Sequence, residues 1–142
     1  MVSNEARNAE RALAIGYAPV ERRAALRALF ALDARLRAIA LAARDPTIGL
    51  MRLTWWRDAL ERLDGAPAPA EPLLRSLASD LVPEVTGAAL ADLTEAWDAL
   101  LSGEGEVARG EALFRLAARV LGVDDPRVGP VGEAWGRVDL AR

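Results

Sequence analysis

The 142-residue chain contains no cysteine, no histidine and no lysine. Without cysteine there can be no disulfide, no thiolate nucleophile and no cysteine-ligated metal; the lack of histidine removes the commonest general base and the commonest metal ligand. Aromatic residues make up only 5% of the chain, with four Trp, two Phe and one Tyr. Any chemistry performed by this chain must therefore use carboxylates, arginines, Tyr17 or a few hydroxyl groups.

The sequence also lacks a concentrated basic patch and a long apolar run. Its 18 basic residues, all arginine, are scattered along the chain, and the formal net charge is −3 with an isoelectric point near 5.1. These properties argue against a nucleic-acid partner. No apolar run approaches about 18 residues, so we expect no transmembrane segment, and the N-terminus is not a signal peptide. We expect a cytoplasmic protein, either soluble or peripheral to a membrane.

Helical periodicity is abundant, and no segment shows the alternation of a strand, which predicts an all-α fold. A chain of this length is expected to form one domain, residues 1–142, with about six to seven helices in an antiparallel helical bundle. Counting their caps, the expected helices span residues 4–17, 19–43, 46–65, 72–81, 86–101, 106–121 and 125–142. The proline-rich segment 65–72 is the obvious linker.

The most informative segment is the helix that contains two adjacent tryptophans. Asp45 is a suitable N-cap, a proline follows at the first helical position, and Gly65 can end the helix in a left-handed conformation. The apolar residues of this segment, Trp55 and Trp56 among them, recur at helical spacing. We expect these two tryptophans, and Trp97 on the helix that follows Thr86, to be structural core residues.

Two sets of charged residues are candidates for a site. Asp33 and Arg37 lie four residues apart on the flank of the second expected helix, where they could form a stabilising ion pair or line a remnant substrate cavity. Asp92, Glu95 and Asp98 form an acidic row, which we interpret as a solvated helix face rather than a metal site. We therefore assign no metal ligands.

Three blocks of the sequence, in order, resemble the first half of squalene and phytoene synthases. They are residues 17–32, which begin Tyr17-Ala18-Pro19, the segment Trp55-Trp56-Arg57-Asp58, and the segment Gly132-Glu133-Ala134-Trp135-Gly136. The resemblance spans about residues 7–142. It implies an all-α isoprenoid synthase fold that condenses two prenyl diphosphates head to head, with Mg²⁺ held by two aspartate-rich motifs.

The chain departs from this family at both aspartate-rich motifs. Arg37, Ala38 and Leu41 stand where the resemblance places metal-binding acids, and neither arginine nor leucine can ligate Mg²⁺. The second motif would fall just past Arg142. We therefore expect no catalytic residue and no cofactor, with Mg²⁺ required only if the chain is the N-terminal part of an active prenyltransferase.

Residues 48–52 and 121–123 look closest to a branch of the family that includes an assembly factor for mitochondrial respiratory complex I and is thought to have lost catalysis. This resemblance implies a non-catalytic assembly or interaction factor. Such a protein would bind a protein partner or hold a prenyl or lipid ligand in a vestigial pocket, for which Asp33, Arg37 and Tyr17 are candidate lining residues. The alternatives are a prenyltransferase that condenses prenyl diphosphates and a helical module that forms a homo-oligomer.

The last expected helix reaches Arg142 without a C-terminal cap, so we expect the chain to be truncated relative to the family. Small residues such as Gly132 should allow this helix to pack closely on a neighbour. In the full family fold further helices would cover Val131, Trp135 and Val138. We therefore expect these three residues to form an interaction surface, with Trp135 at its centre.

Overall fold

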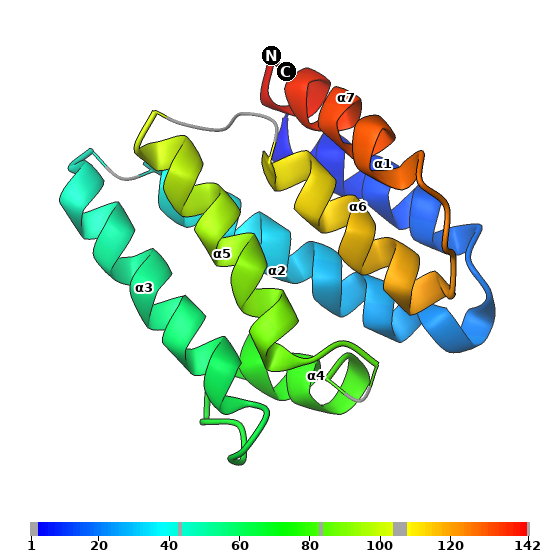
Figure 1. Cartoon of the computed structure of the whole chain (residues 1–142), viewed down its shortest axis with the longest axis horizontal. Helices are drawn as coiled ribbons and strands as arrows, with labels where there is room; N and C mark the ends of the chain where they lie inside the picture. The colour runs from blue at the N-terminus through cyan, green and yellow to red at the C-terminus, as the bar shows by residue number, and fades with distance from the viewer. Residues whose placement is uncertain (1–2, 43, 83, 104–107, 142) are drawn as a thin grey trace.

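The computed structural model describes residues 3–42, 44–82, 84–103 and 108–141. These residues form seven α-helices and one short 3₁₀ helix, and no strand occurs among them (Figure 1). The helices are α1 (Asn4–Gly16), η1 (Val20–Arg22), α2 (Arg23–Ala42), α3 (Pro46–Arg62), α4 (Pro72–Asp80), α5 (Gly87–Leu101), α6 (Ala108–Leu121) and α7 (Val128–Ala141). The prediction of an all-α fold is confirmed.

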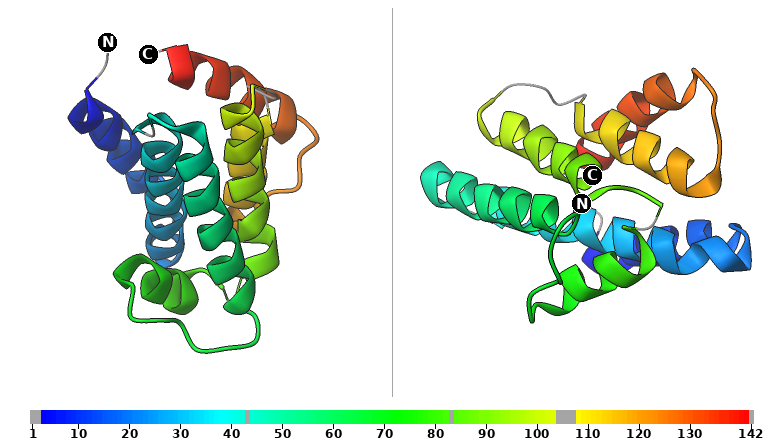
Figure 2. Two further views of the ribbon diagram at one scale, coloured as in Figure 1. Left: turned by 90° about the vertical axis from the view of Figure 1, so that its left-hand side faces the viewer. Right: turned by 60° about the horizontal axis from the view of Figure 1, so that its bottom comes forward.

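The longest helix, α2, organises the bundle. It contacts α1, α3, α4, α5 and α6, whereas α3 packs mainly on α5 and α6 packs mainly on α7. Figure 1 shows α2 running behind α5 and α6, with α3 and α7 at opposite sides of the molecule. The start of α1 and the end of α7 lie at the same end of the bundle (Figure 2). None of the described helices is both long and apolar enough to cross a membrane.

Helix starts follow local capping chemistry. The Asp45 side chain accepts a hydrogen bond from the backbone N–H of Thr47, and the Thr86 side chain accepts one from Ala89, as expected for N-caps. At the far end of α6, Gly122 has a φ of 69°, a left-handed conformation that glycine adopts without a Cβ clash. These boundaries were predictable because each depends on residues within one turn of the helix end.

The end of α3 differs from the prediction. Gly65 is not left-handed; of the described glycines only Gly103 and Gly122 have positive φ. The chain instead leaves α3 through turns in which the backbone N–H groups of Gly65 and Ala66 donate to the carbonyl oxygen of Arg62 at 3.1 and 2.9 Å. The carboxylate of the neighbouring Asp64 accepts hydrogen bonds from the backbone N–H groups of Gly87 and Ala88 at 2.6 and 3.0 Å. This carboxylate thus caps the N-terminus of α5, where the helix dipole favours a negative charge.

Two helix starts are also corrected. The second expected helix begins as the 3₁₀ helix η1 before α2 starts at Arg23. The last one begins at Val128 rather than near residue 125, because Asp125 forms a turn in which it accepts hydrogen bonds from the backbone N–H and the guanidinium of Arg127. The expected helix limits at residues 43, 106 and 142 lie outside the described residues.

The hydrophobic core contains Trp56 and Trp97, which are both buried. Trp55 is 51% exposed, and the expectation that it is a core residue is therefore wrong. The buried residues of α3 include Leu53, Trp56 and Leu60, at spacings of three and four, and Trp55 falls on the flank of that stripe. Trp55 still packs edge-on against Trp56, with 5.4 Å between ring centroids.

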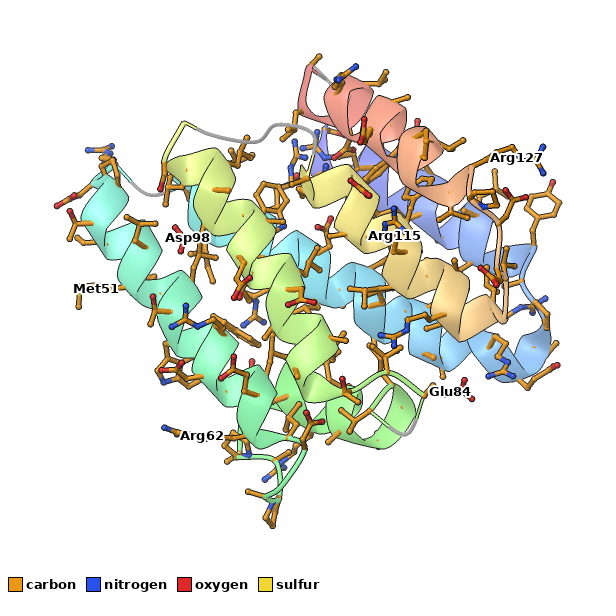
Figure 3. The ribbon with its side chains drawn as sticks, viewed as in Figure 1. Met51, Arg62, Glu84, Asp98, Arg115 and Arg127 are labelled. Atoms are coloured by element: carbon orange, nitrogen blue, oxygen red, sulfur yellow. The ribbon has the colours of Figure 1, made fainter. Side chains whose placement is uncertain are left out.

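The outer side of α3 is partly apolar. Met51 is 67% exposed and, like Arg62, points away from the bundle (Figure 3). A single exposed apolar residue is normal on a protein surface. Met51 and the half-exposed Trp55 together, however, give α3 an apolar flank.

α6 and α7 approach so closely that their backbones touch. A Cβ atom built on Gly110 would lie 2.1 Å from the carbonyl oxygen of Gly132, and one built on Gly132 would lie 2.5 Å from the carbonyl oxygen of Gly110. Real Cβ contacts are never this short, so both positions need glycine. The prediction that the small residues of the last helix allow close packing is confirmed.

Gly110→Ala should therefore lower the free energy of unfolding by about 3 kcal/mol, since the obstacle is a backbone carbonyl and the two helices must separate. Urea unfolding followed by far-UV circular dichroism measures this. Gly65→Ala is the control: its added Cβ meets no atom within 4 Å and should change stability by no more than about 1 kcal/mol. Equal urea midpoints for the two variants would contradict the close approach of α6 and α7.

Candidate functional site

Five charged side chains from four helices meet inside the bundle. We call them the arginine–aspartate network: Arg11 of α1, Asp33 and Arg37 of α2, Arg109 of α6 and Asp139 of α7. Asp33 and Arg109 are fully buried and Asp139 is nearly so, whereas Arg11 and Arg37 lie at the rim. Three guanidiniums face two carboxylates, so the network has a formal charge of +1.

Arg109 is the centre of the network. Its Nε and Nη2 donate to the two carboxylate oxygens of Asp33 at 3.3 and 2.8 Å, and its Nη1 donates to Oδ2 of Asp139 at 2.8 Å. The rings of Trp97 and Trp135 each lie 4.7 Å from the guanidinium carbon. Planar guanidinium suits this arrangement because it combines a fork of donors with faces that attract aromatic rings.

Other side chains also donate hydrogen bonds to the carboxylates of Asp33 and Asp139. The indole Nε1 of Trp97 donates to Oδ1 of Asp33 at 3.0 Å, and Nη2 of Arg11 donates to Oδ2 of Asp33 at 3.0 Å. Arg37 donates to Oδ2 of Asp139 at 2.8 Å. In the described part of the chain no buried side-chain nitrogen or oxygen lacks a hydrogen-bond partner. The network is therefore fully satisfied, as buried polar groups need to be.

Arg109 at the centre of the network and Arg37 at its rim have shifted pKa values. Burial disfavours charge on Arg109, but the attraction and hydrogen bonds of Asp33, followed by those of Asp139, outweigh burial and raise its pKa. For Arg37, burial is the largest cause and lowers the pKa; the attraction of Asp139 opposes it, and repulsion by Arg7 and other arginines adds to the lowering. The positive charge of the network is thus well compensated at Arg109 and poorly compensated at Arg37.

The residues of the network do not fit the Mg²⁺ site that the family resemblance implies. Mg²⁺ needs free carboxylate oxygens, yet the oxygens of Asp33 and Asp139 accept hydrogen bonds from guanidinium groups. Among the described residues no cluster of three acidic side chains is arranged to hold a metal ion. In the acidic row of α5, Asp92 and Glu95 are exposed to solvent.

Asp33 and Arg37 do belong to one site, but they do not form the expected pair with each other. Asp33 pairs with Arg109 and Arg11, and Arg37 pairs with Asp139. Sequence reasoning missed Arg109 and Asp139, which are 76 and 102 residues from their partners on α2. The available signal was Arg109 itself, a charged residue on the same face of α6 as the buried Leu113 and Leu116.

The remaining candidates lie at or near the surface. Tyr17 is 86% exposed, so its side chain does not lie inside a remnant cavity. Trp135 is only partly exposed, and its ring centroid lies 5.2 Å from that of Phe114. Val131 and Val138 are 55% and 58% exposed, as expected for surface residues. The inward turn of Trp135 follows from its stacking on Arg109.

The fold and the site together define an all-α protein whose helices meet at a buried network of ion pairs. The family model for squalene/phytoene synthase matches residues 5–96, from the first turn of α1 into α5. This match covers more than half of the chain, which therefore belongs to the squalene/phytoene synthase family. No curated protein and no solved structure matches it. The matched region contains Asp33 and Arg37 but not Arg109 or Asp139.

Proposed function

We propose that this chain is a non-catalytic member of its family that acts as an assembly or interaction factor by binding a protein partner. The observation that supports the proposal most directly is the arginine–aspartate network. Arg37 stands where the family resemblance places an acid, and the guanidinium of Arg109 fills the space beside Asp33.

The network favours a structural role for both aspartates. Freeing Asp33 and Asp139 to bind a metal would leave the buried Arg109 without its counter-ions, and an unpaired buried charge is strongly destabilising. An arginine also stays protonated at physiological pH, so it cannot serve as a general base. These side chains are therefore suited to holding α1, α2, α6 and α7 together.

Exposed apolar side chains support a role in binding a protein. Val131 and Val138 lie two turns apart on α7, and Met51 and Trp55 lie one turn apart on α3. Apolar residues repeated on one side of a helix are the usual anchors of helix-to-partner contacts. The resemblance to the branch that contains a respiratory complex I assembly factor points to the same class of function.

We expect no condensation product when the chain is incubated with Mg²⁺ and radiolabelled farnesyl or geranylgeranyl diphosphate. The reason is that the aspartates nearest to the expected metal site are paired with arginines. Thin-layer chromatography of the extracted lipids and release of inorganic diphosphate are the two readouts, with an active synthase as the positive control. A squalene-like or phytoene-like product above background would overturn the proposal.

The second candidate function is the N-terminal part of an enzyme that condenses prenyl diphosphates, and the family match over residues 5–96 favours it. Under this alternative the chain would require Mg²⁺ and would bind a prenyl ligand. Titration with Mg²⁺ in the presence of farnesyl diphosphate separates the two candidates. Sedimentation equilibrium, compared with the chain mass of 15.2 kDa, tests whether the bound partner is a second copy.

A further inference from the structure

α1 and α2 enclose a groove of about 280 Å³ that is rich in arginine. We call it the α1–α2 groove. Arg11, Arg23 and Arg27 line it above the apolar side chains of Ile15 and Phe30, and no acidic side chain is among its lining residues in the described part of the chain. α1 runs beside α2 (Figure 1), and the residues that line the groove lie between Asn8 and Gly16 on α1 and between Arg23 and Ala34 on α2. It is distinct from the arginine–aspartate network, with which it shares only Arg11.

Two of its three arginines have no acidic partner among the residues that the structure describes. Arg23 donates only to backbone carbonyls, those of Ala18 and Gly16, both at 2.9 Å. Arg27 is exposed and has neither a hydrogen bond nor an ion pair within the described ranges. These residues are four apart on α2, so their guanidiniums are neighbours on one face, and like charges at this spacing repel.

The charges around the groove are mostly compensated. η1 runs directly into α2 and carries Glu21 in its first turn, where an acidic residue offsets the positive N-terminal end of a helix. Residues 3–42 contain seven arginines and four acidic residues, although the whole chain has a net charge of −3. Three of these arginines, Arg22, Arg35 and Arg37, pair with acidic residues elsewhere in the chain, whereas Arg23 and Arg27 have no such partner among the described residues. The cationic character of the groove therefore comes from Arg23 and Arg27.

We propose that the α1–α2 groove binds an acidic amphipathic helix of a protein partner, an inference that rests on the proposed interaction function. Two carboxylates one turn apart on that helix would face Arg23 and Arg27. An apolar side chain of the same helix would lie over Ile15 and Phe30, as in other helix-in-groove complexes. The groove thus selects a partner helix that has acidic side chains one turn apart next to an apolar side chain.

The geometry favours a helix over a bilayer or a single phosphate. The apolar side chains lie at the bottom of a groove between two helices, which a flat lipid surface does not enter. The two guanidiniums without an acidic partner, those of Arg23 and Arg27, lie one turn apart on α2, and Arg11 already donates to Asp33 and to the Phe30 carbonyl. The donors therefore match charges repeated along a helix rather than one compact anion.

Fluorescence anisotropy with a labelled synthetic helix tests the proposal. The probe has glutamates at i and i+4 and leucines on the adjoining face, and the binding partner is the whole 142-residue chain in low salt. Arg27→Glu should weaken binding roughly tenfold, as should replacing the glutamates of the probe by glutamine, because the contact is electrostatic. Arg52→Glu, the same charge change at an exposed position of α3, should weaken it less than about twofold.

Several binding results would overturn the proposal. Failure of the probe to bind, or equal loss in the Arg27 and Arg52 variants, would show that the proposal is wrong. Arg27-dependent binding of anionic phospholipid vesicles or inorganic diphosphate, without binding of the probe, would also overturn it and assign the groove to those anions. The condensation assay is independent: a prenyl product would refute the proposed function, whereas loss of probe binding alone would refute only this inference.

Discussion

Arg109→Met should lower the free energy of unfolding by about 3–5 kcal/mol, or prevent folding altogether. Methionine has a similar length but no charge, so Asp33 and Asp139 would lose their central donor while remaining buried. Urea denaturation measured by far-UV circular dichroism and tryptophan fluorescence tests this. The fluorescence readout is specific because Trp97 and Trp135 both stack on Arg109.

Arg115→Met is the matched control, since Arg115 is on the same helix and its side chain is 62% exposed in an i,i+4 pair with Glu111 (Figure 3). We expect it to change stability by less than about 0.5 kcal/mol. Adding Asp33→Asn to Arg109→Met should recover part of the loss, because one uncompensated carboxylate is removed. If Arg109→Met unfolds at the same urea concentration as Arg115→Met, the ion pairs are not buried.

Trp56→Ala should cost about 3–5 kcal/mol, because it leaves a large cavity in the core between α3 and its neighbours. The ring of Trp56 is buried, and the guanidinium of Arg35 from α2 lies 5.4 Å from its centroid. Trp55→Ala removes the same side chain from the adjacent position, where half of it is exposed, and should cost less than half as much. Thermal melts of the two variants make the comparison. Similar melting temperatures would mean that α3 packs through a different face.

The features that sequence could predict are those determined by near neighbours. Asp45 and Thr86 cap helices through hydrogen bonds to residues two or three positions away. Gly132 predicts close helix packing because it has no side chain. Asp64 shows the opposite case. It caps the start of α5 more than 20 residues later, and no local pattern contains that contact.

The candidate site shows the same division. Helical periodicity predicted that Asp33 and Arg37 lie on one flank of α2. From sequence alone, the only ion pair that could be predicted for them was the i,i+4 pair with each other. The actual partners come from α6 and α7, and they were selected by the packing of whole helices. The stacking of Trp135 on Arg109 was missed for the same reason, since this contact forms only when those helices are docked.

Arg109 and Gly110 are consecutive, and both face α7. Gly110 sets the separation of the two helices through its contact with Gly132, and this separation determines whether Arg109 can reach Asp139. Arg109, Gly110, Gly132 and Asp139 therefore act as one structural unit. A bulkier residue at either glycine would push the aspartate out of range of the guanidinium, so we expect these four positions to tolerate change only together.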